Sequence, residues 1–125
     1  MDTADNPQEV HQGKRPKILS VCRDRERGIL YARNAVLESA GYRVTTVLRL
    51  NEAVAALNRE RFDVVIISYL YNTTEKSTVA DKAHQAGAKV LCMYWESWPP
   101  QMQADAFIHS LDDPERLLST VASLV

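Results

Sequence analysis

The chain has 125 residues, of which 46% are hydrophobic and 25% are charged, and its formal net charge is -1. This length fits one domain with enough apolar material for a core, and the near-neutral charge argues against nucleic acid or an anionic membrane as a partner. The sequence also has no secretory signal and no apolar run near the roughly 20 residues of a membrane span, so we expect a cytoplasmic protein with no nucleic-acid and no membrane partner.

Residues 1–14 are polar and show no hydrophobic periodicity, so we expect a disordered N-terminal tail followed by one domain over residues 15–125. The two cysteines, Cys22 and Cys92, each lie within an apolar run that is typical of a buried strand. Cysteines in such runs are usually free thiols in a reducing compartment. We therefore predict that the two cysteines do not form a disulfide.

The first part of the domain is predicted to form a strand followed by a helix. Residues 17–22 predict a short buried strand, and residues 25–40 predict a helix that Asp24 caps and Gly41 ends. Apolar residues of this helix recur at helical spacing: Ile29, Ala32, Val36, Leu37 and Ala40. The spacing indicates an amphipathic helix with one apolar face.

The same alternation continues through the middle of the domain. Residues 43–48 are rich in β-branched side chains and predict a second strand. Asn51 can cap a second helix, which turns Val54 and Leu57 inward. Residues 63–69 are apolar on both faces, as expected for a central parallel strand covered by helices.

A weaker helix and two further strands follow. Residues 74–86 carry a thin apolar stripe that predicts a helix, and Gly87 ends it. Residues 90–94 and 106–109 are apolar runs that predict the fourth and fifth strands. Each strand therefore follows a helix or a connecting segment, as in a parallel sheet.

The last helix starts at Asp113-Pro114, where an N-cap residue is followed by proline at the first helical position. Its inner face is formed by four apolar residues: Leu117, Leu118, Val121 and Leu124. Between residues 95 and 105, Pro99-Pro100 prevents a regular helix, so the fourth crossover is expected to be a loop or a single turn. The alternation as a whole implies a doubly wound α/β fold with right-handed crossovers.

Three phrases of the sequence resemble response-regulator receiver domains: LESAGYRV at residues 37–44, Phe62-Asp63 at the entry to the third strand, and QADAF at residues 103–107. The resemblance covers about residues 16–125. It implies a flavodoxin-like, receiver-type doubly wound sheet of five parallel strands in the order 2-1-3-4-5, with the fourth crossover helix shortened or missing. It also implies a response regulator in a two-component system or phosphorelay.

Residues of other types occupy the positions at which receivers bind magnesium and phosphate. By the resemblance, these degenerate phosphoacceptor-site positions are Cys22, Arg23, Asp24, Ser68, Tyr94 and Ser110. Ser68 stands where the family has its phosphorylated aspartate, and a neutral hydroxyl neither attacks a phosphoryl group unaided nor binds magnesium well. Arg23 brings positive charge to the place of a cation. We therefore expect no metal and no cofactor.

These substitutions lead to the hypothesis of a phosphorylation-independent pseudo-receiver, which is not an enzyme and acts in signal transduction by protein–protein interaction. The expected partner is a signalling protein or a second copy in a homodimer, and no output domain is expected after the last helix. The candidate interface combines aromatic residues with a methionine: Tyr94, Trp95, Trp98, Met102 and Phe107. Tryptophan and tyrosine are enriched at contact surfaces, and in the family this region of the fold binds partners.

Other functions remain open at this point. The carboxyl edge of the predicted sheet, with Cys22, Ser68, Tyr94 and Ser110, could bind a small ligand and make the protein a sensor. Cys22 could instead be a nucleophile in a phosphotransfer enzyme if neighbouring arginines lowered its pKa. A weaker alternative is a nucleophilic Ser-His pair after the fifth strand, formed by Ser110 and His109 and oriented by Asp112 or Asp113.

Overall fold

Five parallel strands form one sheet in the computed structural model, which describes residues 15–125. The strands are β2 (Lys17–Val21), β3 (Arg43–Val47), β4 (Val64–Ile67), β5 (Lys89–Tyr94) and β6 (Ala106–His109). Their order in the sheet is β3-β2-β4-β5-β6, which confirms the predicted order 2-1-3-4-5. The predicted tail over residues 1–14 lies outside the described residues.

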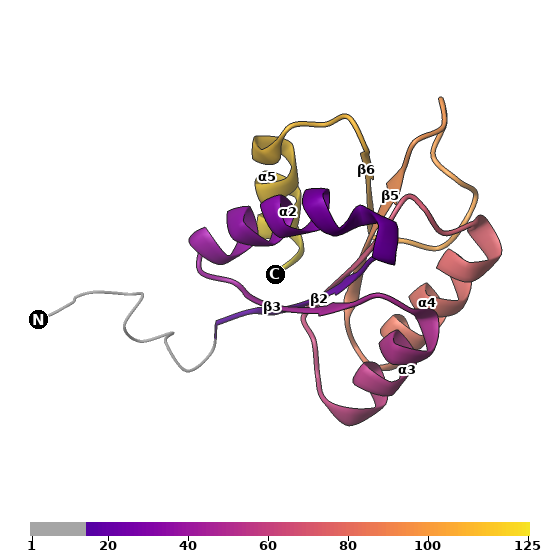
Figure 1. The fold of residues 1–125 in the computed structure, drawn as a ribbon. Helices are drawn as coiled ribbons and strands as arrows, with labels where there is room; N and C mark the ends of the chain where they lie inside the picture. The colour runs from indigo at the N-terminus through magenta and orange to yellow at the C-terminus, as the bar shows by residue number, and fades with distance from the viewer. Residues whose placement is uncertain (1–14) are drawn as a thin grey trace, which may run out of the picture.

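The helices form two layers, one on each face of the sheet. They are α2 (Arg27–Ser39), which follows the short 3-10 turn η2 (Asp24–Glu26), α3 (Leu50–Arg59), α4 (Thr73–Gln85) and α5 (Pro114–Leu124). In Figure 1, α2 and α5 lie above the sheet, and α3 and α4 lie below it. No helix joins β5 to β6, so the prediction of a missing fourth crossover helix is confirmed. None of the helices within residues 15–125 has the length and apolar character needed to cross a membrane.

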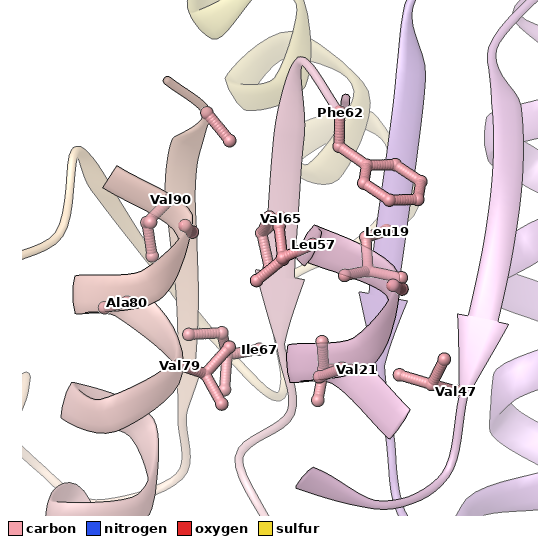
Figure 2. Packing of buried hydrophobic residues seen from close by; sticks show 14 of the residues in the cluster. Leu19, Val21, Val47, Leu57, Phe62, Val65, Ile67, Val79, Ala80 and Val90 are labelled. Atoms are coloured by element: carbon pink, nitrogen blue, oxygen red, sulfur yellow. The ribbon is translucent and has the colours of Figure 1, made fainter. Parts of the chain in front are cut away.

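The central strand β4 packs against helices on both faces. In Figure 2, Leu57 of α3 lies beside Val65 of β4, and Val79 of α4 lies beside Ile67 of the same strand. Val64 and Ile66 belong to a second cluster on the opposite face, under α2 and α5. All four residues of β4 are buried, as the apolar run predicted. Side chains alternate between faces along a strand, so a strand with no polar position requires cover on both sides.

Three of the predicted helix ends are confirmed by local geometry. Gly41 and Gly87 follow α2 and α4 with φ values of 98° and 86°, a left-handed conformation that favours glycine after a helix. The Asp113 side chain accepts a hydrogen bond from the Arg116 backbone N–H at 2.9 Å, and Pro114 takes the first position of α5. The sequence predicted these boundaries correctly because glycine favours the left-handed conformation after a helix and aspartate caps the first turn of one.

Two predicted helix starts are each wrong by two residues. Asp24 begins the 3-10 turn η2 and does not cap α2. Asn51 lies inside the first turn of α3, whose N-cap residue is Arg49 without a side-chain cap. The carboxylate of Glu52 instead accepts a hydrogen bond from the Leu48 backbone N–H at 3.0 Å. Because the Glu52 carboxylate binds this backbone N–H, α3 begins before Asn51.

The buried side of α2 differs from its predicted apolar stripe. Leu30 and Leu37 are buried as its apolar anchors, and Arg33 is buried between them with 7% of its surface exposed. Ile29, in contrast, is 57% exposed. The helix is thus rotated so that an arginine faces the sheet, where it reaches Cys22. Apolar spacing alone misses such an orientation, because it assigns every charged residue to the solvent side.

Candidate functional site

All strands are parallel, so the loops that follow them meet at one edge of the sheet, which is called the carboxyl edge below. This edge carries every degenerate position predicted from the sequence: Cys22, Arg23, Asp24, Ser68, Tyr94 and Ser110. Strand β2 lies between β3 and β4, so the first crossover leads to one side of β2 and the next crossover returns to its other side. Ligands of open α/β sheets bind at such a switch point.

Ser68 is fully buried at the tip of β4. Its Oγ accepts a hydrogen bond from the Leu70 backbone N–H at 3.0 Å, and its own backbone N–H donates to the Val21 carbonyl at 2.9 Å. The hydroxyl therefore stabilises the turn after the strand, as serine side chains commonly do. A phosphoryl donor in solution does not reach a side chain with no exposed surface.

Arg23 lies across the carboxyl edge, after β2. Its guanidinium is 4.9 Å from the centre of the Tyr71 ring, and its Nη1 is 3.9 Å from the Glu75 carboxylate. The Tyr71 hydroxyl donates a 2.7 Å hydrogen bond to the Cys22 carbonyl, which ties the β4 loop to the β2 loop. Asp24 is exposed beside them. The cation–π contact holds a positive charge at this point.

Within residues 15–125, no three His, Cys, Asp or Glu side chains gather closely enough to hold a metal ion. Divalent cations such as Mg²⁺ need carboxylate oxygens, and the carboxyl edge presents a guanidinium near its centre instead.

The two cysteines do not form a disulfide, as predicted, and both are buried. The Cys22 thiol lies 3.2 Å from the Ser20 hydroxyl and 3.5 Å from Arg33 Nη1, on the face covered by α2. Cys92 contacts Met102, with 3.6 Å between the two sulfur atoms. Burial raises the pKa of the Cys92 thiol to about 11, more than the nearby Lys76 lowers it. Neither thiol is exposed to a substrate.

The ring nitrogens of His109 are engaged away from Ser110. Nδ1 accepts a hydrogen bond from the Leu111 backbone N–H at 3.1 Å, and Nε2 is 3.2 Å from the Trp95 carbonyl, to which it can only donate. These partners define the neutral imidazole with its hydrogen on Nε2. The Asp112 carboxylate accepts from the His109 backbone N–H rather than from the ring. The ring nitrogens therefore make no base for the Ser110 hydroxyl in this geometry.

The β5–β6 loop exposes both tryptophans, and we call Tyr94, Trp95, Trp98 and Phe107 the aromatic surface. Trp95 is 62% exposed and Trp98 is 79% exposed. Tyr94 packs edge-on against Phe107, with 6.5 Å between ring centres. Met102 instead packs against the core cluster between the sheet and helices α3 and α4, where its sulfur contacts Cys92.

Lys76 of α4 is a buried charged residue that the sequence analysis did not single out. Only 1% of its surface is exposed, and its Nζ donates a 2.8 Å hydrogen bond to the Met93 carbonyl near the end of β5. Its position could have been noticed, because it shares the helical spacing of Val79, Ala80 and Ala83 on the buried side of α4. Arg33 is the other buried cation among the described residues.

No protein-family model and no curated protein matches the chain. Solved structures of receivers do match it. The chemotaxis response regulator CheY4 of Vibrio cholerae superposes with a TM-score of 0.74 at 24% identity, over 90% of this chain and 100% of that chain. A response regulator receiver protein of Sinorhizobium medicae gives 0.77 at 18% identity, over 89% and 94%. The chain has the receiver-domain fold.

The receiver fold also includes a metal-bound relative. The receiver domain of the sensor histidine kinase PA1611 from Pseudomonas aeruginosa, with a magnesium ion coordinated in its active-site cleft, matches with a TM-score of 0.71 at 16% identity, over 88% of this chain and 97% of that chain. At these identities the likeness establishes the fold, and the activity depends on the residues at the carboxyl edge.

Proposed function

We propose that this receiver fold works without phosphorylation, as a pseudo-receiver in two-component or related signalling, and that it acts by binding another protein. The observation that carries the proposal is the state of the carboxyl edge. The strand tip carries a buried serine whose hydroxyl already accepts a backbone N–H. Beside it lies a guanidinium, stacked on a tyrosine ring.

Electrostatics support the absence of phosphoryl transfer. The reaction depends on carboxylates that hold magnesium and on a nucleophile that faces the donor. Arg23 repels a divalent cation at this position, and its Nη1 pairs at 3.9 Å with the Glu75 carboxylate. Ser68 is buried in a turn and has no exposed oxygen.

Exposure of the aromatic surface supports a binding role. Large aromatic side chains are the residues most often found at the centre of protein interfaces. Trp98 is 79% exposed on a loop with two prolines, which limit the conformational entropy lost on binding. The partner we propose is a signalling protein or a second copy of this chain.

Phosphorylation is tested by incubating the protein with labelled acetyl phosphate and Mg²⁺, beside a receiver that has the full set of acidic residues. We expect the control to take up label and this chain to take up none. Stable label on Ser68, or on any other residue, would refute phosphorylation independence.

Binding is tested with Trp98→Ala, and Tyr31→Ala serves as a matched control because Tyr31 is 65% exposed on α2, outside the aromatic surface. Sedimentation at several concentrations measures self-association, and pull-down from the native host measures capture of other proteins. We expect Trp98→Ala to weaken the association at least about tenfold and Tyr31→Ala to leave it unchanged. Equal effects of the two variants would remove the aromatic surface from the proposal.

A further inference from the structure

Two open cavities at the carboxyl edge meet at Arg25. The first, of about 390 Å³, is lined by the loops that follow β4 and β5 and is called the aromatic cavity below. The second, of about 460 Å³, lies between the start of η2 and the loop from β3 to α3 and is called the arginine cavity. Arg25 of η2 lines both. Each volume is within the ~300–1,000 Å³ of small-molecule sites, so one ligand that passes Arg25 can occupy both.

Positive charge dominates the arginine cavity. Arg23, Arg25 and Arg49 line it, and the only acid among its lining residues is Asp24. Arg25 and Arg49 are exposed, and no salt bridge of either is found among the described side chains. Guanidinium groups bind phosphate oxygens through pairs of parallel hydrogen bonds. One aspartate offsets one of three cations, so this cavity favours an anion with more than one charge.

The stacked pair of Arg23 and Tyr71 forms a wall between the cavities. Tyr71 lines the aromatic cavity and Arg23 lines the arginine cavity, with 4.9 Å between the guanidinium and the ring centre. Tyr71 is buried, and its hydroxyl donates to the Cys22 carbonyl, so the wall is held from the core. Arg23 retains these contacts and acts on a ligand through its charge. Direct contacts with an anion therefore fall to the exposed guanidinium groups of Arg25 and Arg49.

The aromatic cavity has ring surface and an acidic border. Tyr69, Trp95 and Glu96 line it, and Trp95 is 62% exposed. The backbone of Trp95 is held at both ends, since its N–H donates to Glu96 Oε1 and its carbonyl lies 3.2 Å from His109 Nε2. Nucleobases stack on such aromatic side chains with little dependence on the base. The Glu96 carboxylate can accept an N–H of a base and repels a phosphate.

From these two cavities, we propose that the carboxyl edge binds a free nucleotide, whose base lies against Trp95 and whose phosphates lie between Arg25 and Arg49. Charge sets the orientation, because Glu96 excludes phosphate from the aromatic cavity and the arginines attract it to the other. The net charge of -1 favours a free nucleotide over a nucleic-acid strand. The inference does not depend on the proposed protein–protein interaction, and the site shares only Trp95 with the aromatic surface.

The test is an NMR titration of the full chain with ADP and GDP, and with the two halves of ADP, adenosine and pyrophosphate. We expect at least one nucleotide to shift the amide signals of both cavity linings saturably, with a dissociation constant of about 0.1 mM or lower, and each half to bind at least about tenfold more weakly. No saturable shift with either nucleotide up to about 5 mM, or pyrophosphate binding as tight as that of the nucleotides, overturns the proposal. Tighter binding of a short single-stranded oligoadenylate than of ADP overturns the assignment to a free nucleotide.

Two arginine variants test the phosphate half. Arg25→Gln and Arg49→Gln change exposed side chains, so the fold should be retained, and Arg59→Gln at an exposed position of α3 is the matched control. Each cavity variant should weaken nucleotide binding at least about fivefold and leave adenosine binding unchanged, while the control changes neither. Unchanged nucleotide binding in both cavity variants would overturn the proposal.

One tryptophan variant tests the base half. Trp95→Ala should weaken the binding of nucleotide and adenosine at least about fivefold and leave pyrophosphate binding unchanged. The control is Trp98→Ala, in the same loop but outside the cavity lining, which should bind all probes as the wild type does. Equal losses in the two variants would overturn the placement of the base. Because the protein-association assay uses Trp98→Ala, failure of either proposal is seen independently of the other.

Discussion

The two faces of the sheet are built differently. The face covered by α3 and α4 is packed with an apolar cluster, part of which Figure 2 shows, and α4 adds one buried charge, Lys76, and a capping box at its start. The face under α2 and α5 contains buried polar groups near the carboxyl edge and a cavity of about 220 Å³. Its polar residues include Ser20, Arg33 and Ser68.

This difference suggests a division of roles between the faces. Dense apolar packing supplies most of the favourable free energy of folding, so the α3/α4 face is expected to carry much of the stability. Cavities and buried polar groups cost stability, and ligand pockets are concave and combine an apolar wall with a few polar groups. The α2/α5 face and the β5–β6 loop are therefore the regions where function is expected, and the following experiments test the contrast.

The largest difference is expected between two isoleucines. Ile67→Ala removes a fully buried side chain below α3 and α4, and it should lower the free energy of unfolding by about 2–5 kcal/mol. Ile29→Ala, at a half-exposed position on α2, should change it by less than about 0.5 kcal/mol. Urea unfolding with an unchanged m-value measures both. Similar losses would mean that the two faces contribute equally.

The next largest loss of stability is expected when the capping box at the start of α4 is removed. The Asn72 side chain accepts the Glu75 backbone N–H at 2.8 Å, and the Glu75 carboxylate accepts the Asn72 backbone N–H at 2.9 Å. Asn72→Ala should cost about 1–2 kcal/mol, because it leaves a first-turn donor of α4 without its partner. The control is Asn58→Ala at an exposed position in α3, which should be neutral or slightly stabilising in the same unfolding assay. A neutral Asn72→Ala would contradict this role.

A smaller effect is expected at Asp105, before β6. Burial raises the pKa of its carboxyl, but hydrogen bonds from His84 and from the Val90 backbone N–H outweigh burial and hold that pKa below its usual value. A lowered pKa in the folded state gives stability that is complete above the unfolded pKa of about 3.9 and is lost as the pH falls through the folded pKa.

Asp105→Asn should therefore reduce stability at pH 7 by less than about 1 kcal/mol, since water screens this partly exposed pair. The difference from the wild type should shrink as the pH falls below about 4, because the unfolded carboxyl is protonated first and the folded carboxyl, with its lower pKa, afterwards. Thermal unfolding between acid and neutral pH measures it, with Asp81→Asn on the exposed side of α4 as the control. A difference that grows as the pH falls would contradict the sign.

The smallest response is expected from the Cys92 thiol. With its pKa raised to about 11 by burial, roughly one molecule in a thousand carries the thiolate at pH 8. A Cys22→Ser variant isolates this thiol, which should react with an aromatic disulfide reagent only as fast as the protein opens. Addition of denaturant should restore rapid reaction. Rapid stoichiometric reaction of the native protein would contradict the burial.

Much of the fold was predictable from local patterns. The apolar run of β4 requires cover on both faces, and Gly87 and Pro114 mark helix boundaries through their backbone conformations. The loop between β5 and β6 followed from Pro99-Pro100. The start of α3 was misjudged, because Glu52 competes with Asn51 as an acceptor for the first backbone donors.

The candidate site was less predictable. The positions at the carboxyl edge were located by resemblance, and they do meet at one edge, since parallel strands end there together. The roles of Tyr71 and Lys76 were not foreseen, because each depends on a carbonyl group distant in sequence. Such partners come together only when the elements pack.

The sequence by itself determined the alternation of strands and helices, the central position of β4 and the exposed aromatic loop. Those features follow from side-chain periodicity and backbone preferences, which act over a few residues. Only the tertiary structure decided that the Lys76 ammonium binds the Met93 carbonyl, that Arg33 faces the Cys22 thiol and that a cavity opens between α2 and α5. The partner of a long charged side chain depends on which element lies opposite it, and helical spacing does not carry that information.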